Sequence, residues 1–174
     1  MILVVSASLK AVSKGRLLAA EARRVLDEAG EAVTWLDLRD HPLPLCDGGP
    51  SYDHPNVGVL EELVRSARAV LIATPIYNYD VTATVKNLVE LTGDAWEDKV
   101  VGFLCTAGGP SSYMSVMSFA NSLMLDFRCV IVPRFVYATG KDFAGGRIVD
   151  EEVIRRVGEL ARAAGRLGGP VKPA

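Results

Sequence analysis

Short apolar runs alternate along the chain with longer segments in which apolar residues recur at helical spacing. A continuous apolar run, rather than an alternating one, is typical of a strand that helices cover on both faces. Five runs fit this description, at residues 2–5, 32–36, 69–73, 100–105 and 130–136. The pattern therefore predicts an α/β fold with five buried strands in one parallel sheet.

The segments between these runs each carry a single apolar stripe, which predicts helices that pack on the sheet. Three acidic residues at 150–152 favour the start of the last helix, because negative charge is stabilised at a helix N-terminus. The residues that share one face are Leu18, Ala22, Val25 and Ala29 in the first helix, Leu60, Leu63, Val64 and Ala67 in the second, and Val153, Ile154, Val157, Leu160, Ala161 and Ala164 in the last.

The connections restrict the topology. Short crossovers between parallel strands are right-handed almost without exception, so few arrangements remain for five strands and five helices. We predict the doubly wound, flavodoxin-like strand order 2-1-3-4-5, in preference to half of a Rossmann fold, because of the loops at the ends of the strands. Two long connections, 39–56 and 138–149, are rich in Gly, Pro or Asp. We expect residues 1–174 to form a single domain.

Charge and composition exclude several classes of function. A formal net charge of -2 and scattered basic residues give no electrostatic footprint for nucleic acid. Apolar runs stop well short of the about 20 residues that span a bilayer, so we expect no membrane segment. The N-terminus begins directly with a strand and lacks the features of a secretory signal, which favours a cytoplasmic location.

Cysteine and histidine offer little support for a metal site. Cys46, Cys105 and Cys129 are odd in number and widely spaced, as expected of reduced thiols rather than of a disulfide framework or a zinc site. His41 and His54 both lie in a loop-like stretch, where solvent exposure is the favoured interpretation. We therefore predict no bound metal.

The loop after the first strand favours a phosphate. It offers hydroxyl groups, cations and the free N-H groups of a helix N-terminus. A simpler interpretation is that Ser13 only caps the helix. The sequence here has neither the glycine triplet of dinucleotide folds nor the GK[ST] of nucleotide triphosphatases, which argues against a nucleotide held by its pyrophosphate. The side chains concerned are Ser6, Ser8, Lys10, Ser13 and Lys14.

Two further loops at the same sheet edge suit an aromatic ligand. Tyr77 and Tyr79 come after the third strand and supply flat surfaces, while Asn78 carries both a donor and an acceptor. After the fourth strand, Gly108 and Gly109 allow close approach of the backbone to a ligand, although a plain turn explains them equally well. For the helix after the third strand, the simplest interpretation makes its Lys86 and Asn87 solvated polar positions.

These motifs resemble those of the NADPH-dependent FMN reductase family. Residues 7–13, ASLKAVS, resemble its GSxRxxS phosphate loop, and residues 75–78, PIYN, followed by 85–87, VKN, resemble its PxYNxSxPGxLKN motif. Gly108-Gly109 lies where the family has a glycine-rich flavin loop. Departures from the motifs are Ala7 for Gly, Lys10 for Arg, Asp80 for Ser and Thr82-Ala83 for Pro-Gly.

The resemblance implies FMN as cofactor and NADPH or NADH as hydride donor, with a quinone, azo compound, metal oxyanion or free flavin as acceptor. The cofactor carries such chemistry, so no catalytic acid-base residue is expected. By this resemblance, the FMN phosphate is surrounded by Ser8, Lys10, Ser13 and Lys14, the ring and ribityl chain are bordered by Pro75, Ile76, Tyr77 and Asn78, and the pyrimidine edge is faced by Gly108 and Gly109.

Two other functions are alternatives. A flavodoxin-like electron carrier would bind FMN without oxidising NAD(P)H directly, but Lys10, Lys14 and the nearly balanced charge favour the reductase. A hydrolase would use Cys105 or a serine as nucleophile, but neither histidine lies in a motif that would activate one.

The segment 113–127 is apolar around most of a helix, which requires cover on more than one face. A deep core helix and a subunit interface explain this equally well. The family resemblance, which implies dimers that build a site between subunits, favours a homodimer or homotetramer.

Overall fold

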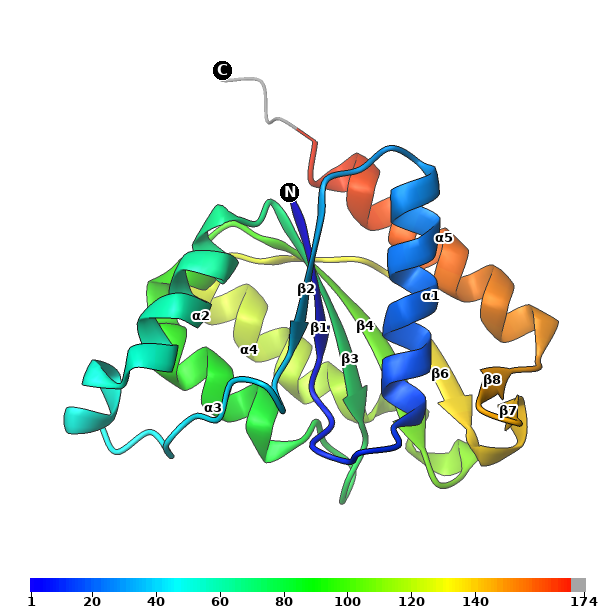
Figure 1. Ribbon diagram of the computed structural model, residues 1–174, viewed down its shortest axis with the longest axis horizontal. Coiled ribbons are helices and arrows are strands. Elements are labelled where there is room, and N and C mark those ends of the chain that lie inside the picture. The colour runs from blue at the N-terminus through cyan, green and yellow to red at the C-terminus, as the bar shows by residue number, and fades with distance from the viewer. Residues whose placement is uncertain (170–174) are drawn as a thin grey trace.

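The computed structural model of the protein describes residues 1–169, so the last five residues of the predicted domain 1–174 lie outside the described residues. Its main sheet is parallel, and its strands are β1 (Ile2–Ser6), β2 (Val33–Asp37), β3 (Ala69–Pro75), β4 (Val100–Ala107), β5 (Val130–Ile131) and β6 (Val136–Thr139). They run in the order β2-β1-β3-β4-β5, with β6 also paired to β4 (Figure 1). The predicted strand order is confirmed.

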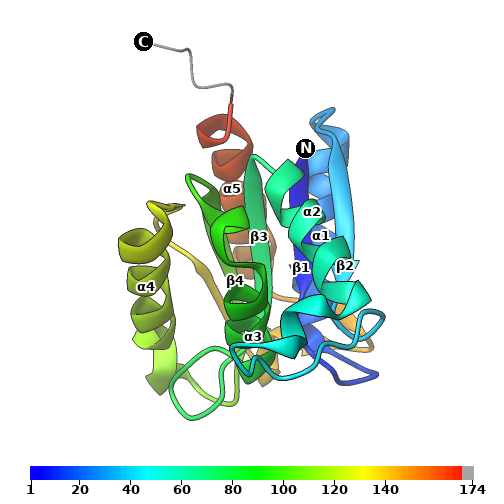
Figure 2. The same cartoon turned by 90° about the vertical axis from the view of Figure 1, so that its left-hand side faces the viewer.

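Helices cover both faces of this sheet, as Figures 1 and 2 show. One face is covered by α1 (Lys14–Glu28) and α5 (Glu151–Leu167), and the other by α2 (Pro55–Ser66), α3 (Ala83–Thr92) and α4 (Met117–Phe127). Successive residues of β1 enter opposite cores: Leu3 and Val5 pack on the α2 side, whereas Ile2 and Val4 pack on the α1 side. This alternation explains why the strand is apolar at every position.

The carboxyl ends of the central strands lie nearly level, within three residues of one another. Ser6, the last residue of β1, pairs with Asp37 of β2 and with Ala73 of β3. Pro75, the last residue of β3, pairs with Thr106 of β4. The loops after β1, β3 and β4 therefore meet at one edge of the sheet.

The fifth predicted strand, 130–136, is divided in the structure, so the prediction of one continuous strand was wrong. Pro133 has no N-H to donate to a neighbouring strand, and Arg134 has a left-handed φ of 60°. Val132 still donates to the carbonyl of Val101 at 2.8 Å. The chain then rejoins β4 as β6, which reaches the level of Ala107 at the carboxyl edge.

Two segments, 113–127 and 138–149, differ in secondary structure from what the sequence pattern predicted. Residues 113–127 are not one helix, because a 3-10 segment, Pro110–Val116, precedes α4. The connection 138–149 contains a hairpin of β7 (Phe143–Ala144) and β8 (Arg147–Ile148), and its turn uses positive φ at Gly145 and Gly146. Within residues 1–169, no helix has both the length and the apolar character to cross a membrane.

Candidate functional site

Three loops enclose a cavity of about 230 Å³ at the carboxyl edge of the sheet, which we call the edge cavity. They come after β1, β3 and β4. The residues predicted to bind the cofactor that line it are Ser8, Lys10, Ser13, Lys14, Pro75, Ile76, Tyr77 and Gly108. Val12, Thr106 and Ala107 also line it, although they were not among the residues predicted to bind the cofactor. Residues that are 100 positions apart in the chain are thus brought together around one space.

Two of the predicted residues do not line the edge cavity. Asn78 lies with Tyr79 at the tip of an exposed turn, both with left-handed φ, and the turn is closed by mutual backbone hydrogen bonds of 3.0 Å between Tyr77 and Asp80. The carbonyl of Gly109 accepts a hydrogen bond from the hydroxyl of Tyr137. Asn78 and Gly109 therefore shape their loops rather than the cavity wall.

Helix α1 presents its N-terminus to the edge cavity. Ser13 is the N-cap, and its Oγ accepts from the N-H of Arg16 at 3.3 Å. The first turn contains no acidic residue, while Lys14 adds a cation there. Free N-H groups, the helix dipole and an ammonium group all favour an anion at this position. The capping role of Ser13 is therefore real, and it is compatible with a phosphate site.

A largely buried ion pair holds the loop between β1 and α1 in place. Arg16 Nε donates to Asp37 Oδ2 at 2.6 Å, and Arg16 Nη1 donates to the carbonyls of Ala11 at 3.0 Å and Lys10 at 3.3 Å. The side chain of Asp37 is only 7% exposed. This pair fixes the backbone of the loop to the end of β2. The sequence gives only a partial signal for this pair: an arginine in the first turn of a helix is unfavourable without a counter-charge, but the rule does not identify Asp37 as the partner.

The loop after β3 is tied to the loop after β1. Thr84 Oγ1, in the first turn of α3, donates to the carbonyl of Ala7 at 2.9 Å. The backbone N-H of Ile76 donates to the carbonyl of Thr106 at 2.8 Å, which joins it to β4. Asp80 is exposed, and its Oδ1 accepts from the N-H of Val81 at 2.7 Å. Its carboxylate thus caps its own turn.

Burial makes Cys105 and Cys129 poor nucleophiles. It raises the pKa of the Cys105 thiol to about 12 and, against a weaker opposing hydrogen bond, that of Cys129 to about 11. Both thiols stay protonated near neutral pH, whereas the thiolate is the reactive form. The hydrolase alternative that used Cys105 loses its nucleophile.

Comparison with known proteins gives consistent results. A family model described as NADPH-dependent FMN reductase matches residues 1–144. An NAD(P)H-dependent FAD/FMN reductase of Geobacillus thermodenitrificans is 34% identical over 145 residues, which are 81% of this chain and 77% of the relative. A probable NADPH:quinone oxidoreductase 2 of Oryza sativa subsp. japonica is 26% identical over 164 residues, 86% of this chain and 79% of the relative.

Solved structures support the fold. An NADH:FMN oxidoreductase (EMOB) in its apo form has a TM-score of 0.81 at 19% identity, covering 99% of this chain and 91% of that one. A flavodoxin from the domain Archaea has a TM-score of 0.63 at 10% identity, covering 97% and 99%. The flavodoxin-like prediction is confirmed.

Replacing Ser13 with Asp tests the predicted phosphate site. Asp caps helices well, so apoprotein stability should be retained, but its charge would repel the phosphate. We expect FMN binding to weaken by about 2 kcal/mol, roughly 30-fold, with riboflavin binding little changed. Flavin fluorescence titration measures both affinities. Val59→Asp, at an exposed position of α2, is the control. Unchanged FMN affinity in Ser13→Asp would assign Ser13 a purely structural role.

Replacing Asp37 with Asn tests the ion pair. The substitution leaves the Arg16 charge poorly compensated, so the free energy of unfolding should fall by about 2 kcal/mol, below the usual cost for a fully buried pair because Arg16 is 23% exposed. FMN binding should weaken more than riboflavin binding, because the loop carries the phosphate ligands. Urea unfolding of the apoprotein measures the first effect, with the exposed Asp40→Asn as control. Equal losses for the two flavins would contradict the positioning role.

Proposed function

The chain belongs to the NADPH-dependent FMN reductase family, and we propose that it is an FMN-dependent NAD(P)H oxidoreductase with a quinone, azo compound, metal oxyanion or free flavin as acceptor. The observation that carries this proposal is the edge cavity. It joins a cationic helix N-terminus to an aromatic loop and a glycine-rich loop within one space. FMN combines the matching parts, an anionic phosphate and a flat ring.

The phosphate half of the proposed site rests on α1 and the loop before it. Ser8 and Ser13 are almost fully buried, so their hydroxyls sit where water competes little for a hydrogen bond. Lys10 and Lys14 add charge-assisted donors. Because the Arg16-Asp37 pair holds the loop backbone, these donors are oriented before the ligand arrives, which lowers the entropic cost of binding.

The ring half rests on the loops after β3 and β4. The N-H of Ile76 donates to the carbonyl of Thr106, so the start of the loop after β3 is bonded to the end of β4. Tyr77 is 55% exposed and offers a flat surface at the cavity mouth. Space is open around Gly108, where an added Cβ would meet no atom within 4 Å. We propose that the ring lies between Tyr77 and Gly108.

Bound FMN supplies two-electron chemistry, and the chain supplies position and electrostatics. In this proposal the backbone N-H groups near Gly108 stabilise negative charge on the pyrimidine edge. The loops after β1 and β3 orient the ring through their mutual hydrogen bond from Thr84 to Ala7. Proton transfer from a protein acid would not be required, because the edge cavity is open to solvent at the exposed side chain of Tyr77.

Space beside the ring favours the reductase over the electron carrier. A second hollow of about 410 Å³ shares Ser8, Pro75 and Tyr77 with the edge cavity. A nicotinamide or an acceptor ring needs such a space next to the flavin, whereas a protein that exchanges single electrons at the exposed ring edge does not. In this proposal NAD(P)H binds in this space first and leaves as NAD(P)⁺. The acceptor then binds in the same space.

We further propose a homodimer or homotetramer formed through α4. Its exposed side and the segment before it carry apolar side chains among polar ones such as Ser118 and Asn121, with Met114 61%, Met117 41% and Leu125 78% exposed. Adjacent exposed apolar side chains of this kind mark interaction surfaces. A cytoplasmic location is also proposed, and the free thiols of Cys46, Cys105 and Cys129 are consistent with a reducing compartment.

Reduction by pyridine nucleotide separates the two candidate functions. We expect the protein to bind FMN at least about tenfold more tightly than riboflavin. We also expect NADPH or NADH, added without oxygen, to bleach the visible absorbance of the bound flavin within seconds. A visible spectrum recorded before and after each addition measures this. A stable oxidised spectrum in the presence of both nucleotides would favour the electron carrier.

Sedimentation tests the proposed interface. The wild-type protein should sediment as an oligomer at micromolar concentration, and Leu125→Asp should shift it toward monomer, because a charge in an apolar interface loses its hydration. Leu125 is largely exposed, so the fold should be retained. Val59→Asp, at an exposed position of α2, is the control. A monomeric wild-type protein would refute the interface.

A further inference from the structure

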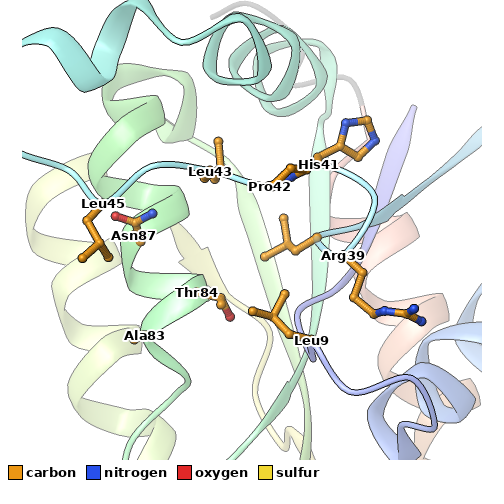
Figure 3. A pocket seen from close by; sticks show the side chains of 10 residues that line it. Leu9, Arg39, His41, Pro42, Leu43, Leu45, Ala83, Thr84 and Asn87 are labelled. Atoms are coloured by element: carbon orange, nitrogen blue, oxygen red, sulfur yellow. The ribbon is translucent and has the colours of Figure 1, made fainter.

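A larger pocket, of about 470 Å³, lies beside the edge cavity at the same sheet edge (Figure 3). It is enclosed by the loop after β1, the long connection after β2 and the first half of α3. Most of its wall is hydrocarbon. Four of the lining residues are leucines, so we call it the leucine pocket. Its apolar lining consists of Leu9, Leu38, Pro42, Leu43, Leu45 and Ala83.

The polar side chains of this wall are engaged or face outward. Thr84 Oγ1 donates to the carbonyl of Ala7. Asn87 Oδ1 accepts from the N-H of Cys46, and its Nδ2 donates to the carbonyl of Pro44, each at 2.8 Å. Figure 3 shows Arg39 and His41 pointing away from the space between Leu43 and Leu9. A ligand in the pocket therefore meets hydrocarbon on most sides.

Hydrogen bonds to the backbone hold the wall in place. Asn87, only 9% exposed, fastens the connection after β2 to α3, so the interpretation of Asn87 as a solvated position was wrong. Asn56 Nδ2 adds a bond of 2.8 Å to the carbonyl of Pro42. At the mouth, Leu45 is 80% and Leu9 59% exposed. The pocket is thus built from fixed backbone and presents apolar side chains that gain from being covered.

The leucine pocket is continuous with the proposed cofactor site. The second hollow of about 410 Å³, here called the connecting hollow, shares Leu9, Ala83 and Thr84 with the leucine pocket. It shares Ser8, Pro75 and Tyr77 with the edge cavity. The residues that line the leucine pocket and those that line the edge cavity are different sets. The leucine pocket therefore suits a part of a substrate that does not react.

We propose that the acceptor is a quinone with a hydrocarbon side chain, whose ring lies in the connecting hollow and whose side chain lies in the leucine pocket. The inference rests on the proposed function. The adenosine half of NAD(P)H fits this wall less well, because its many polar atoms would be desolvated without partners. A hydrocarbon chain has no such cost, and each buried methylene improves affinity about fourfold.

The overall reaction is balanced by reactants already named. The quinone receives a hydride equivalent from NAD(P)H and one proton from solvent, and the products are NAD(P)⁺ and the quinol. Both carbonyl groups of the quinone become hydroxyl groups. The side chain takes no part in this exchange, so its contribution is to affinity.

Two quinones that differ only in the side chain test the proposal. Suitable probes are 2,3-dimethoxy-5-methyl-1,4-benzoquinone and its 6-decyl derivative. Isothermal titration calorimetry with the oxidised, FMN-loaded protein, without NAD(P)H, gives the two dissociation constants. We expect the decyl compound to bind at least about tenfold more tightly, and kcat/KM with NADPH as donor to rise by a similar factor.

Leu45→Asp locates the effect in the leucine pocket. Leu45 is largely exposed, so the fold should be retained, while a carboxylate at the mouth disfavours a hydrocarbon chain. We expect this variant to lose most of the side-chain advantage, with unchanged affinity for the short quinone and for FMN. Leu167→Asp, at an exposed leucine at the end of α5, is the control and should keep the advantage.

Equal affinity of the wild-type protein for the two quinones would overturn the proposal. So would a Leu45→Asp variant that keeps the side-chain advantage, or one whose main defect is a raised KM for NADPH, which would assign the pocket to the nucleotide. Failure of the proposed function is distinguishable, because it would appear as bound FMN that NADPH and NADH leave oxidised. The calorimetric comparison of the two quinones still decides the pocket in that case.

Discussion

Burial of the sheet on both faces is the constraint on which the remaining structure depends. Because β1 sends alternate side chains into two separate cores, it has no surface left for polar chemistry along its length. Ligand-binding groups are therefore confined to the loops beyond the strand ends. The nearly level ends of β1, β3 and β4 then determine that these loops meet. Position in the fold, rather than proximity in the chain, assembles the edge cavity.

Holding those loops still requires polar contacts that the apolar cores do not supply. The Arg16-Asp37 pair fixes the loop after β1 to β2, and Thr84 fixes α3 to the same loop. Such contacts add little net stability where solvent competes, but they specify one arrangement of the backbone. The apolar cores therefore stabilise the fold, and a few buried hydrogen bonds define the geometry of the site.

The sequence was sufficient for the first four strands, the strand order and the three loops, because each depends on local periodicity or on the residues directly after a strand. It was insufficient where a partner is distant. Asn87 bonds to a loop 41 positions away, and no local pattern distinguishes it from a solvated polar residue. Asn78 and Gly109 were predicted from motifs. Whether a loop residue lines the edge cavity depends on the direction in which the loop turns, which a motif does not specify. The break at Pro133 was readable, since proline interrupts strand pairing.

Separate walls for the proposed cofactor site and the proposed acceptor pocket would have an evolutionary consequence. The edge cavity and the leucine pocket are lined by different residues, and the side chains of Asn87 and Asn56 fasten the connection after β2 that forms much of the pocket. Mutations in residues 39–56 can then accumulate while the flavin environment stays intact. Such a scaffold is modular: new acceptor preferences can arise by exchanging one loop, without passing through variants that lose the cofactor.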